Sequence, residues 1–341
     1  MTGTDGLTVA VTGPTGDIGR SLLRALEGSD RVTRVLGMAR RPFDPEAHGW
    51  SKVSYRQGDV LDPDSVAALV ADADVVVHLA FLIFGTREQT REVNLCGSRN
   101  VFEAVAAAGV RRFVYTSSVA AYGFGDDTPE HVDETVQPRG SEAFYYSAQK
   151  AELEALLQEI LGAAGVDVYI FRPVVVAGPD ALLLVDSIAK SFQIGGRFPV
   201  ERQLVKALPW LRPMLPDPGV AMQLVHHDDV ADALVAAIEG QGTPGIYNLA
   251  APDPVSLSEV AHALGWRPLP IPRQAVPIAA AAIERLQRFL PQDLAWVNAM
   301  RKTLVLETTK AHKELGWHPR HSAHAALRET AIAARLQGLL S

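Results

Sequence analysis

A glycine-rich turn between an apolar run and a helical pattern is the feature that most limits how this chain can fold. Residues 7–12 (LTVAVT) have the composition of a buried strand, and apolar residues from Ile18 to Leu26 then recur at the spacing of one helix face. Between the two patterns, glycines stand at positions 13, 16 and 19. A strand that turns this tightly into a helix is typical of the first unit of a parallel sheet.

Strand and helix patterns continue to alternate as far as residue 173. We expect strands at residues 32–38, 53–57, 74–80, 113–117 and 166–171, and helices at residues 64–70, 90–108 and 143–161. Asp62 and Pro63 supply a capping oxygen and a first helical residue that needs no N–H partner. Apolar strands separated by helices predict an α/β fold with a Rossmann-type doubly wound parallel sheet.

The pattern becomes irregular after Pro173, although residues 229–239 again indicate a helix and residues 247–249 a strand. We expect residues 1–178, with about 223–250, to form the domain that holds the sheet. Residues 179–222 and 251–341 are expected to form a smaller, discontinuous second region that lies over the sheet.

Composition limits the class of protein. The chain has 341 residues, 48% of them hydrophobic, which is enough to bury a large core. A net charge of −7 argues against a nucleic-acid partner, because phosphate backbones repel acidic surfaces. The single cysteine, Cys96, excludes an internal disulfide and is expected to be a small buried hydrophobe. Without a signal-peptide pattern or a bilayer-spanning apolar run, a cytoplasmic protein with no membrane contact is expected.

Each glycine of the turn has a separate use in a nucleotide site. Gly13 permits the tight turn, Gly16 lets the backbone approach a pyrophosphate, and Gly19 lets helix and strand pack closely. The helix N-terminus adds free N–H groups and a positive dipole. The turn therefore predicts dinucleotide binding.

The end of the second strand indicates which dinucleotide is bound. An NAD site usually has an acid there to hold the ribose 2′-hydroxyl, but this strand ends in Arg40 and Arg41, with no carboxylate before Asp44. Guanidinium groups suit a 2′-phosphate, since they present a planar fork to its oxygens. NADP is therefore favoured and NAD is possible; if both arginines are merely solvated, the preference is lost.

A tyrosine and a lysine supply candidate acid–base chemistry. Tyr146 and Lys150 are four residues apart in a predicted helix, so both project from one face. Tyr145 has Gln149 at the same offset, which makes Tyr146 the reactive candidate. A free phenol has a pKa of about 10, but a neighbouring ammonium and an oxidised nicotinamide would both favour the phenolate. Ser118, directly after a predicted strand, could donate a hydrogen bond to a substrate oxygen.

Taken together, these motifs resemble the extended short-chain dehydrogenase/reductase (SDR) family, of the NAD(P)-dependent epimerase/dehydratase type. The resemblance rests on TGPTGDIG, GDV at residues 58–60, DVVVHLA, VYTSSVAAYG, YSAQK, FRPVVVAGP and LVHHDDVADAL. It implies that residues 1–178 with about 223–250 are a dinucleotide-binding Rossmann domain, and that residues 179–222 and 251–341 are a small C-terminal substrate-binding region. It also implies a catalytic triad of Ser118, Tyr146 and Lys150, and a homodimer formed by the helices near 90–108 and 143–161. The cofactor-binding candidates are then Gly13, Thr15, Gly16, Asp17, Ile18, Gly19, Arg40, Arg41, Asp59, Val60, Leu79, Ala80, Asn94, Thr116, Tyr146, Lys150 and Pro173.

Departures from the family pattern narrow the expected chemistry. Dehydratases of the family carry an Asp-Glu pair where this chain has Val119 and Ala120, so dehydration is not expected. Nucleotide-sugar enzymes usually have asparagine after the Arg-Pro pair, where this chain has three valines, 174–176. The region beyond adds leucines rather than arginines, namely Leu182, Leu183, Leu184 and Leu204. A diphosphate needs cationic or N–H partners, so a compact or apolar small-molecule substrate is indicated.

We therefore predict an oxidoreductase that transfers a hydride between a nicotinamide and a carbinol or carbonyl carbon, as a ketone or aldehyde reductase or an alcohol dehydrogenase. Two alternatives stay open. One is a nucleotide-sugar 4-epimerase with bound NAD, and the other is a non-catalytic sensor that binds NADP.

Three further features are interpreted as structural. The run from His226 to Asp229 looks like a metal cluster, but neighbouring residues do not face one point, so we expect Asp229 to be a helix N-cap with solvated neighbours and no metal to bind. His78, inside an apolar strand, is expected to be a hydrogen-bonded core histidine. The stretch Ala275–Leu290 is expected to pack as core or lid, because its cationic excess is small for a membrane-binding helix.

Overall fold

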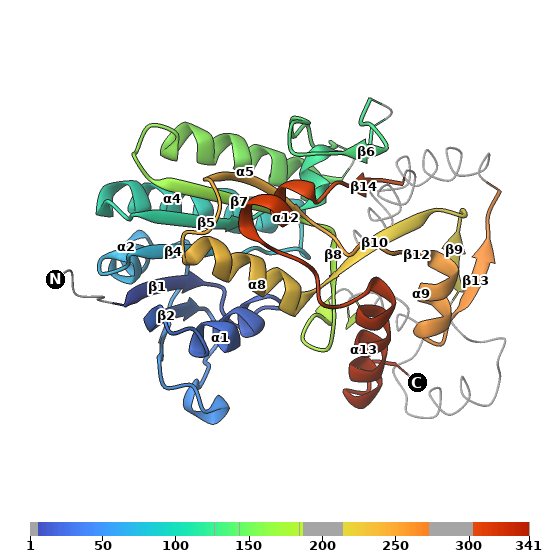
Figure 1. Ribbon diagram of the computed structural model, residues 1–341, viewed down its shortest axis with the longest axis horizontal. Helices are drawn as coiled ribbons and strands as arrows, with labels where there is room; N and C mark the ends of the chain where they lie inside the picture. The colour runs from blue at the N-terminus through green and yellow to red at the C-terminus, as the bar shows by residue number, and fades with distance from the viewer. Residues whose placement is uncertain are drawn as a thin grey trace.

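Seven parallel strands form the central sheet, so the predicted Rossmann-type α/β fold is confirmed (Figure 1). In spatial order they are β11 (Gly245–Leu249), β7 (Asp167–Pro173), β5 (Arg112–Thr116), β4 (Val75–His78), β1 (Leu7–Thr12), β2 (Val32–Ala39) and β3 (Val53–Gln57). The chain runs outward from β1 through β2 to β3, then returns to β4 on the other side of β1. The loops after β1 and β4 therefore diverge at the carboxyl edge, where sheets of this kind bind ligands.

The computed structural model describes residues 6–125, 127–142, 144–183, 185–186, 214–272 and 303–340. Leu184, Leu204 and Ala275–Leu290 lie outside the described residues, as do residues 187–213. What the sequence predicts for these positions stays a prediction.

Helices cover both faces of the sheet because its strands are apolar on both faces (Figure 1). One face carries α1 (Gly19–Glu27), α8 (His227–Ile238) and α12 (Thr309–Leu315), and the other carries α2 (Pro63–Val70), α4 (Gly97–Ala108) and α5 (Tyr145–Leu161). Along β1 the side chains alternate: Val9 and Val11 pack with Leu22 of α1, whereas Ala10 packs with Phe102 of α4. Asp62 caps α2 as predicted, accepting a hydrogen bond from Asp64 N.

The helix predicted over residues 90–108 is interrupted. α3 (Arg87–Arg91) ends in a π-helical turn, Glu92–Cys96, from which α4 continues. The turn changes the register of the helix and leaves Cys96 on its outer surface. The expectation that Cys96 is buried is therefore wrong.

Short elements outside the main sheet account for the irregular second half of the sequence. β8 (Val175–Ala177), β10 (Ala221–His226) and β12 (Pro254–Ser256) form one small sheet. β9 (Met214–Asp217) pairs with β13 (Arg267–Pro270), and β6 (His131–Val132) pairs with β14 (Val305–Leu306). Two further helices, α9 (Leu257–Ala263) and α13 (Ala323–Leu336), pack against each other and against these strands.

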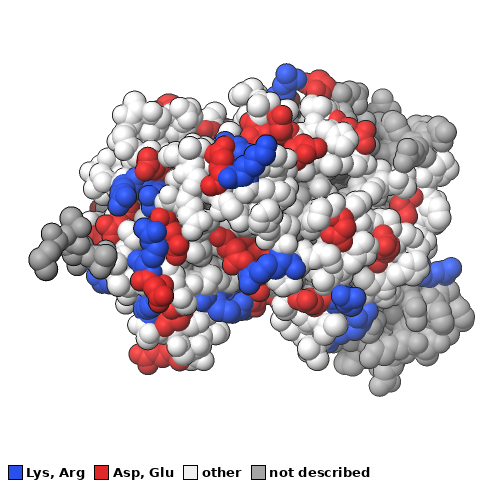
Figure 2. All heavy atoms as spheres, viewed as in Figure 1, with Lys and Arg blue, Asp and Glu red and all other residues white. Residues whose placement is uncertain are grey.

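The surface carries both signs of charge. On the face shown in Figure 2, basic and acidic side chains lie side by side over the helices rather than in separate fields. None of the helices that the structure describes combines the length and apolar character needed to cross a bilayer.

Candidate active site

The glycine turn lies between the ends of β1 and β4, and packing explains two of its three glycines. Gly13 has a φ of +73°, and a Cβ there would lie 2.7 Å from the backbone nitrogen of Ala80. A Cβ on Gly19 would lie 2.5 Å from the carbonyl oxygen of Gly13. Gly16 differs, because it is exposed and a Cβ there would meet only the Gly13 oxygen, at an ordinary 3.5 Å. No contact within the described protein therefore requires glycine at position 16.

Two observations fit a dinucleotide at this edge. The N-terminus of α1 follows the turn without a side-chain cap; Arg20 N there already donates to Gly16 O at 3.3 Å, and the helix dipole favours a phosphate at this end. At the end of β5, the hydroxyl of Thr116 is buried and has no hydrogen-bond partner in the described part of the chain. A buried hydroxyl is rarely left unpaired, so a bound ligand or an ordered water supplies its partner.

The neighbouring strand ends hold the other predicted cofactor residues. Arg40 and Arg41 follow β2 and are exposed, while the Asp59 carboxylate after β3 accepts a hydrogen bond from Leu61 N at 3.0 Å. Thr15, Asp17 and Ile18 belong to the glycine turn, Leu79 follows β4, Pro173 ends β7, and Val60 packs against Gly97 of α4.

Asn94 is buried, and the protein itself satisfies its amide. Its oxygen accepts from Leu82 N at 2.7 Å, and its nitrogen donates to Leu82 O at 3.0 Å and to Gln149 Oε1 at 2.8 Å. Asn94 therefore holds the loop after β4 against α5, and acts on a ligand there only through that loop.

The structure brings the three predicted catalytic residues together. Tyr146 and Lys150 lie one turn apart on α5, and Ser118 begins the short helical turn after β5. Ser118 is hydrogen-bonded to Tyr146. The Lys150 ammonium donates to Thr116 O at 3.0 Å and lies 6.0 Å from the centre of the Tyr146 ring.

The acid–base balance differs from the expectation in one respect. Burial raises the pKa of Tyr146, and the hydrogen bond from Ser118 opposes this only in part. Burial also lowers the pKa of Lys150 to about 7, against an opposing effect of Glu154. The expected lowering of the phenol pKa by the ammonium is not found in the free protein: burial is the largest effect, and the group that opposes it is Ser118 rather than Lys150.

Aromatic rings enclose the phenol. The Phe81 ring lies 5.4 Å from the Tyr146 ring and nearly perpendicular to it, and the Phe144 ring lies 5.6 Å away. Phe124 packs in turn on Phe144, with 6.1 Å between ring centres. Sequence reasoning missed these residues, because aromatic side chains in loops carry no pattern that separates a site wall from ordinary packing.

A buried ion pair holds α5 against the sheet near the site. Arg172 of β7 and Glu154 of α5 are both buried, and the guanidinium donates to both carboxylate oxygens, through Nε at 3.0 Å and Nη2 at 2.5 Å. The Ser117 hydroxyl donates to the same carboxylate at 2.5 Å. These bonds join α5, which carries Tyr146, to the two strands beneath it.

Asp17 connects the glycine turn to the segment after β8. Its carboxylate accepts a hydrogen bond from Leu183 N at 3.4 Å. Burial raises its pKa to about 6, against opposing effects of this bond, Arg20 and His227. An acid therefore lies desolvated where the turn meets the second half of the chain.

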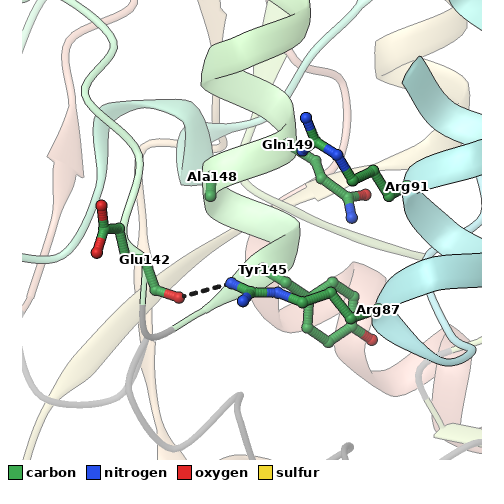
Figure 3. Close-up of a pocket in the computed structure, with 6 residues that line it drawn as sticks. All are labelled: Arg87, Arg91, Glu142, Tyr145, Ala148 and Gln149. Atoms are coloured by element: carbon green, nitrogen blue, oxygen red, sulfur yellow. Dashed lines mark hydrogen bonds between the residues drawn. The ribbon is translucent and has the colours of Figure 1, made fainter. Parts of the chain in front are cut away.

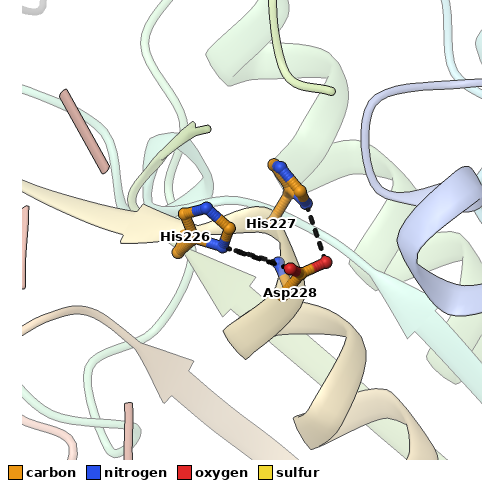
Figure 4. Close-up of side chains that lie close together, drawn as sticks. All are labelled: His226, His227 and Asp228. Atoms are coloured by element: carbon orange, nitrogen blue, oxygen red, sulfur yellow. Dashed lines mark hydrogen bonds and ion pairs between the residues drawn. The ribbon is translucent and has the colours of Figure 1, made fainter. Parts of the chain in front are cut away.

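His226, His227 and Asp228 place possible ligand atoms within 4.8 Å of one another (Figure 4). Their ring nitrogens, however, already have protein partners. In His226, Nδ1 accepts from Asp228 N at 3.1 Å and Nε2 lies 3.2 Å from the Glu329 carboxylate. In His227, Nδ1 lies 3.1 Å from the Asp228 carboxylate and Nε2 accepts from Asp180 N at 3.2 Å. Hydrogen bonding accounts for the cluster without a metal ion.

The expected cap at Asp229 is wrong. α8 begins at His227 and its cap is His226, both of them buried rather than solvated. Asp229 is fully buried and accepts hydrogen bonds from Arg320 N at 2.9 Å and His321 N at 3.1 Å. A buried carboxylate needs such donors, and they come from residues too distant in sequence to predict.

His78 is a core histidine, as predicted. Its ring nitrogens lie 2.7 Å from the hydroxyl of Thr12 and 2.9 Å from that of Ser98. Complete burial lowers its pKa to about 3, so the ring is neutral.

A cavity of about 510 Å³ lies beside the cluster of Ser118, Tyr146 and Lys150 rather than at it (Figure 3). Arg87 and Arg91 from α3 face Tyr145 and Gln149 of α5 across it, and Arg87 donates to the carbonyl oxygen of Glu142 at 3.2 Å. The cavity therefore lies on the flank of α5 next to the one that carries Tyr146.

Comparisons with known proteins agree with this architecture. The chain is 28% identical over 338 residues to an uncharacterized protein of Sinorhizobium fredii, a match that covers 95% of this chain and 77% of the relative. It is 32% identical over 193 residues to cinnamoyl-CoA reductase 1 of Petunia hybrida, covering 52% of this chain and 57% of the relative.

Among solved structures, UDP-glucuronic acid 4-epimerase from Bacillus cereus, in complex with NAD, superposes with a TM-score of 0.72 at 18% identity. That match covers 97% of this chain and 99% of the epimerase and shows a common fold. Residues 9–250 match the sequence pattern of one family directly. The chain thus belongs to the NAD dependent epimerase/dehydratase family.

Proposed function

We propose that this protein is an NADP-dependent oxidoreductase that interconverts a carbonyl compound and its alcohol, on a compact apolar substrate. The observation that carries the proposal is that Ser118, Tyr146 and Lys150 meet at the carboxyl edge of the sheet that also carries the glycine turn. A bound nicotinamide would supply or accept the hydride. The glycine turn would hold the diphosphate of this dinucleotide, and the hydroxyl of Thr116 would form a hydrogen bond with the bound dinucleotide.

The side chains at the cluster have distinct proton roles. In the reducing direction, the Tyr146 hydroxyl donates its proton to the substrate oxygen, while the Ser118 hydroxyl donates a hydrogen bond to the same oxygen as charge develops on it. The raised pKa of Tyr146 keeps the phenol protonated and ready to donate at neutral pH. Lys150, buried beside it, stabilises the phenolate that remains.

The substrate class follows from the wall of the site. Phe81 and Phe144 pack on the phenol ring, Phe124 packs on Phe144, and Val175 and Val176 begin β8, the strand that follows β7. Rings and branched aliphatic side chains favour an apolar molecule over a sugar diphosphate, whose charges need guanidinium or N–H partners. The match to a cinnamoyl-CoA reductase over about half of each chain supports a reductase.

The cofactor preference rests on Arg40 and Arg41. Both are exposed beside the site predicted for the adenosine ribose, and a 2′-phosphate would give them a partner. Replacing both with Ala should weaken NADP binding by about 100-fold, since each charge-assisted contact contributes ~1.5 kcal/mol, while NAD binding changes little. Equal losses for both cofactors in calorimetric titrations would contradict the preference.

The decisive experiment follows NADPH absorbance with a panel of aldehydes and ketones, and assays UDP-sugars separately for redox-neutral inversion. Net NADPH consumption supports the reductase, whereas inversion without net consumption identifies a 4-epimerase. Tyr146→Phe should lower kcat by about 10²–10⁴-fold while cofactor affinity stays unchanged, because only the hydroxyl is removed. The matched control Tyr145→Phe should keep full activity. Cofactor binding without turnover of any compound would favour the sensor.

We also propose a homodimer through the face formed by α3, α4 and α5. This face carries the Arg91–Glu152 ion pair and a second hollow that includes Cys96 and Ala155. Ala155 is exposed on α5, so Ala155→Arg should give a monomer in light scattering, whereas the control Ala67→Arg on α2 should remain a dimer. A monomeric parent protein would refute this assembly.

A further inference from the structure

Phe81 contacts both titratable residues of the catalytic cluster from outside the helix that carries them. It lies in the loop after β4, and its ring centre is 3.8 Å from the Lys150 ammonium. The same ring lies 5.4 Å from the Tyr146 ring at an interplanar angle of 84°. Since Asn94 holds Leu82, the next residue, through two hydrogen bonds, the loop has a defined position.

The surroundings of Lys150 show why a ring face there matters. Its hydrogen-bond partners are neutral, the carbonyl oxygen of Thr116 at 3.0 Å and the hydroxyl of Tyr115 at 3.5 Å. Glu154 is the acid that acts on it, one turn along α5, and both oxygens of that carboxylate already accept from Arg172. The remaining titratable groups around Lys150 are His78, which is neutral, and Tyr146.

The face of an aromatic ring is negative and attracts a cation most strongly where water is excluded. The Phe81 ring therefore offers the ammonium a partner that its neutral neighbours and the engaged carboxylate do not. Because the ring also touches Tyr146, its position fixes the spacing of the two catalytic groups.

We propose that Phe81 is a positioning residue, whose ring face keeps the buried Lys150 ammonium charged and whose contact with Tyr146 sets the separation of the two groups. This inference deepens the proposed function and rests on it for its kinetic consequence alone. The state of Lys150 can be measured in the free protein.

The direct test is the pKa of Lys150 from NMR titration of isotope-labelled lysine side chains in the full chain. The chain has seven lysines, and a Lys150→Arg variant assigns the signal. Phe81→Leu should lower the Lys150 pKa by about one unit, since the ring contact favours the charged form. Phe81→Tyr keeps a ring face and should restore the parent value. Equal pKa values in the parent and in Phe81→Leu would overturn the proposal.

Trifluorophenylalanine, fluorinated at the meta and para positions, separates electrostatics from shape if Phe81→Leu does not fold. It keeps the ring but weakens its negative face, so the Lys150 pKa should fall as in Phe81→Leu. An unchanged pKa with the fluorinated ring would show that Phe81 acts by packing alone and would overturn the proposal.

A second readout is the pH profile of kcat/KM for alcohol oxidation. In Phe81→Leu the lowered pKa of Lys150 leaves less of the charged lysine to stabilise the Tyr146 phenolate, so the pKa of Tyr146 rises. The acidic limb of the profile should therefore move to higher pH in Phe81→Leu and return to the parent position in Phe81→Tyr. An unmoved limb in Phe81→Leu would contradict the kinetic part of the proposal. If the parent protein turns over no carbonyl compound, the proposed function fails, while the NMR result still decides the role of Phe81.

Discussion

Replacing Gly16 with Val separates the needs of the fold from those of the ligand. A Cβ at position 16 has room, because the nearest atom, Gly13 O, would lie an ordinary 3.5 Å away, and the backbone there lies outside the left-handed region. The free energy of unfolding should therefore change by no more than about 1 kcal/mol. Gly19→Ala should behave differently, because its Cβ would meet backbone atoms at 2.5 Å, and a loss of several kcal/mol is expected.

Gly16→Val should greatly weaken the affinity of the protein for a dinucleotide. Branched atoms at this exposed point would push a diphosphate away from the N-terminus of α1. Losing two charge-assisted hydrogen bonds at ~1.5 kcal/mol each removes about 3 kcal/mol, which corresponds to a Kd about 100-fold weaker.

Calorimetric titration with NADP and NAD measures the affinity, and denaturant unfolding measures the stability. Gly28→Val is the matched control, since Gly28 ends α1 at its far end, with an α-helical backbone and a nearest contact of 3.6 Å. It should fold and bind like the parent. Parental affinity in Gly16→Val would refute the assignment of this turn to the diphosphate.

Two further predictions concern buried carboxylates. Asp17→Asn should stabilise the protein by about 2 kcal/mol at pH 8 and hardly at all at pH 4 in denaturant unfolding. Folding raises the pKa of Asp17 to about 6, so the folded protein favours the protonated acid. The stability that the protonated acid provides is lost as the pH rises through 6, whereas Asn stays neutral at every pH. An equal stabilisation by Asp17→Asn at pH 4 and pH 8 would contradict this. Glu154→Gln should cost about 3–5 kcal/mol, because it leaves the Arg172 guanidinium buried without its anion, and Glu159→Gln, on the exposed side of α5, should cost less than about 0.5 kcal/mol in the same assay.

The parts that sequence predicted are those that short-range pattern determines. β1, β3 and α2 lie where apolar runs and the Asp62–Pro63 pair placed them, and the glycine turn follows from spacing alone. Tyr146 and Lys150 lie one turn apart on α5, as their spacing predicted, while their catalytic role stays a prediction.

What sequence could not supply depends on contacts between distant segments. The partners of Asp229 lie more than ninety positions along the chain, so its carboxylate looked like a local cap. The pKa of Tyr146 rises because of burial, a property of the assembled site. Phe81 stands in an unpatterned loop, and its ring reaches Lys150 only after β4 and α5 have packed on either side.

The π-helical turn at Glu92–Cys96 lets α3 and α4 form one continuous helix while their side chains face different directions. It holds more residues than an α-helical turn, so α3 and α4 point their side chains with an offset of about 100° per inserted residue. Deleting one residue would straighten this helix, swing Arg87 and Arg91 around its axis and draw the Asn94 amide away from Leu82. Insertions or deletions at this turn would thus change the position of the loop after β4 without changing the sheet.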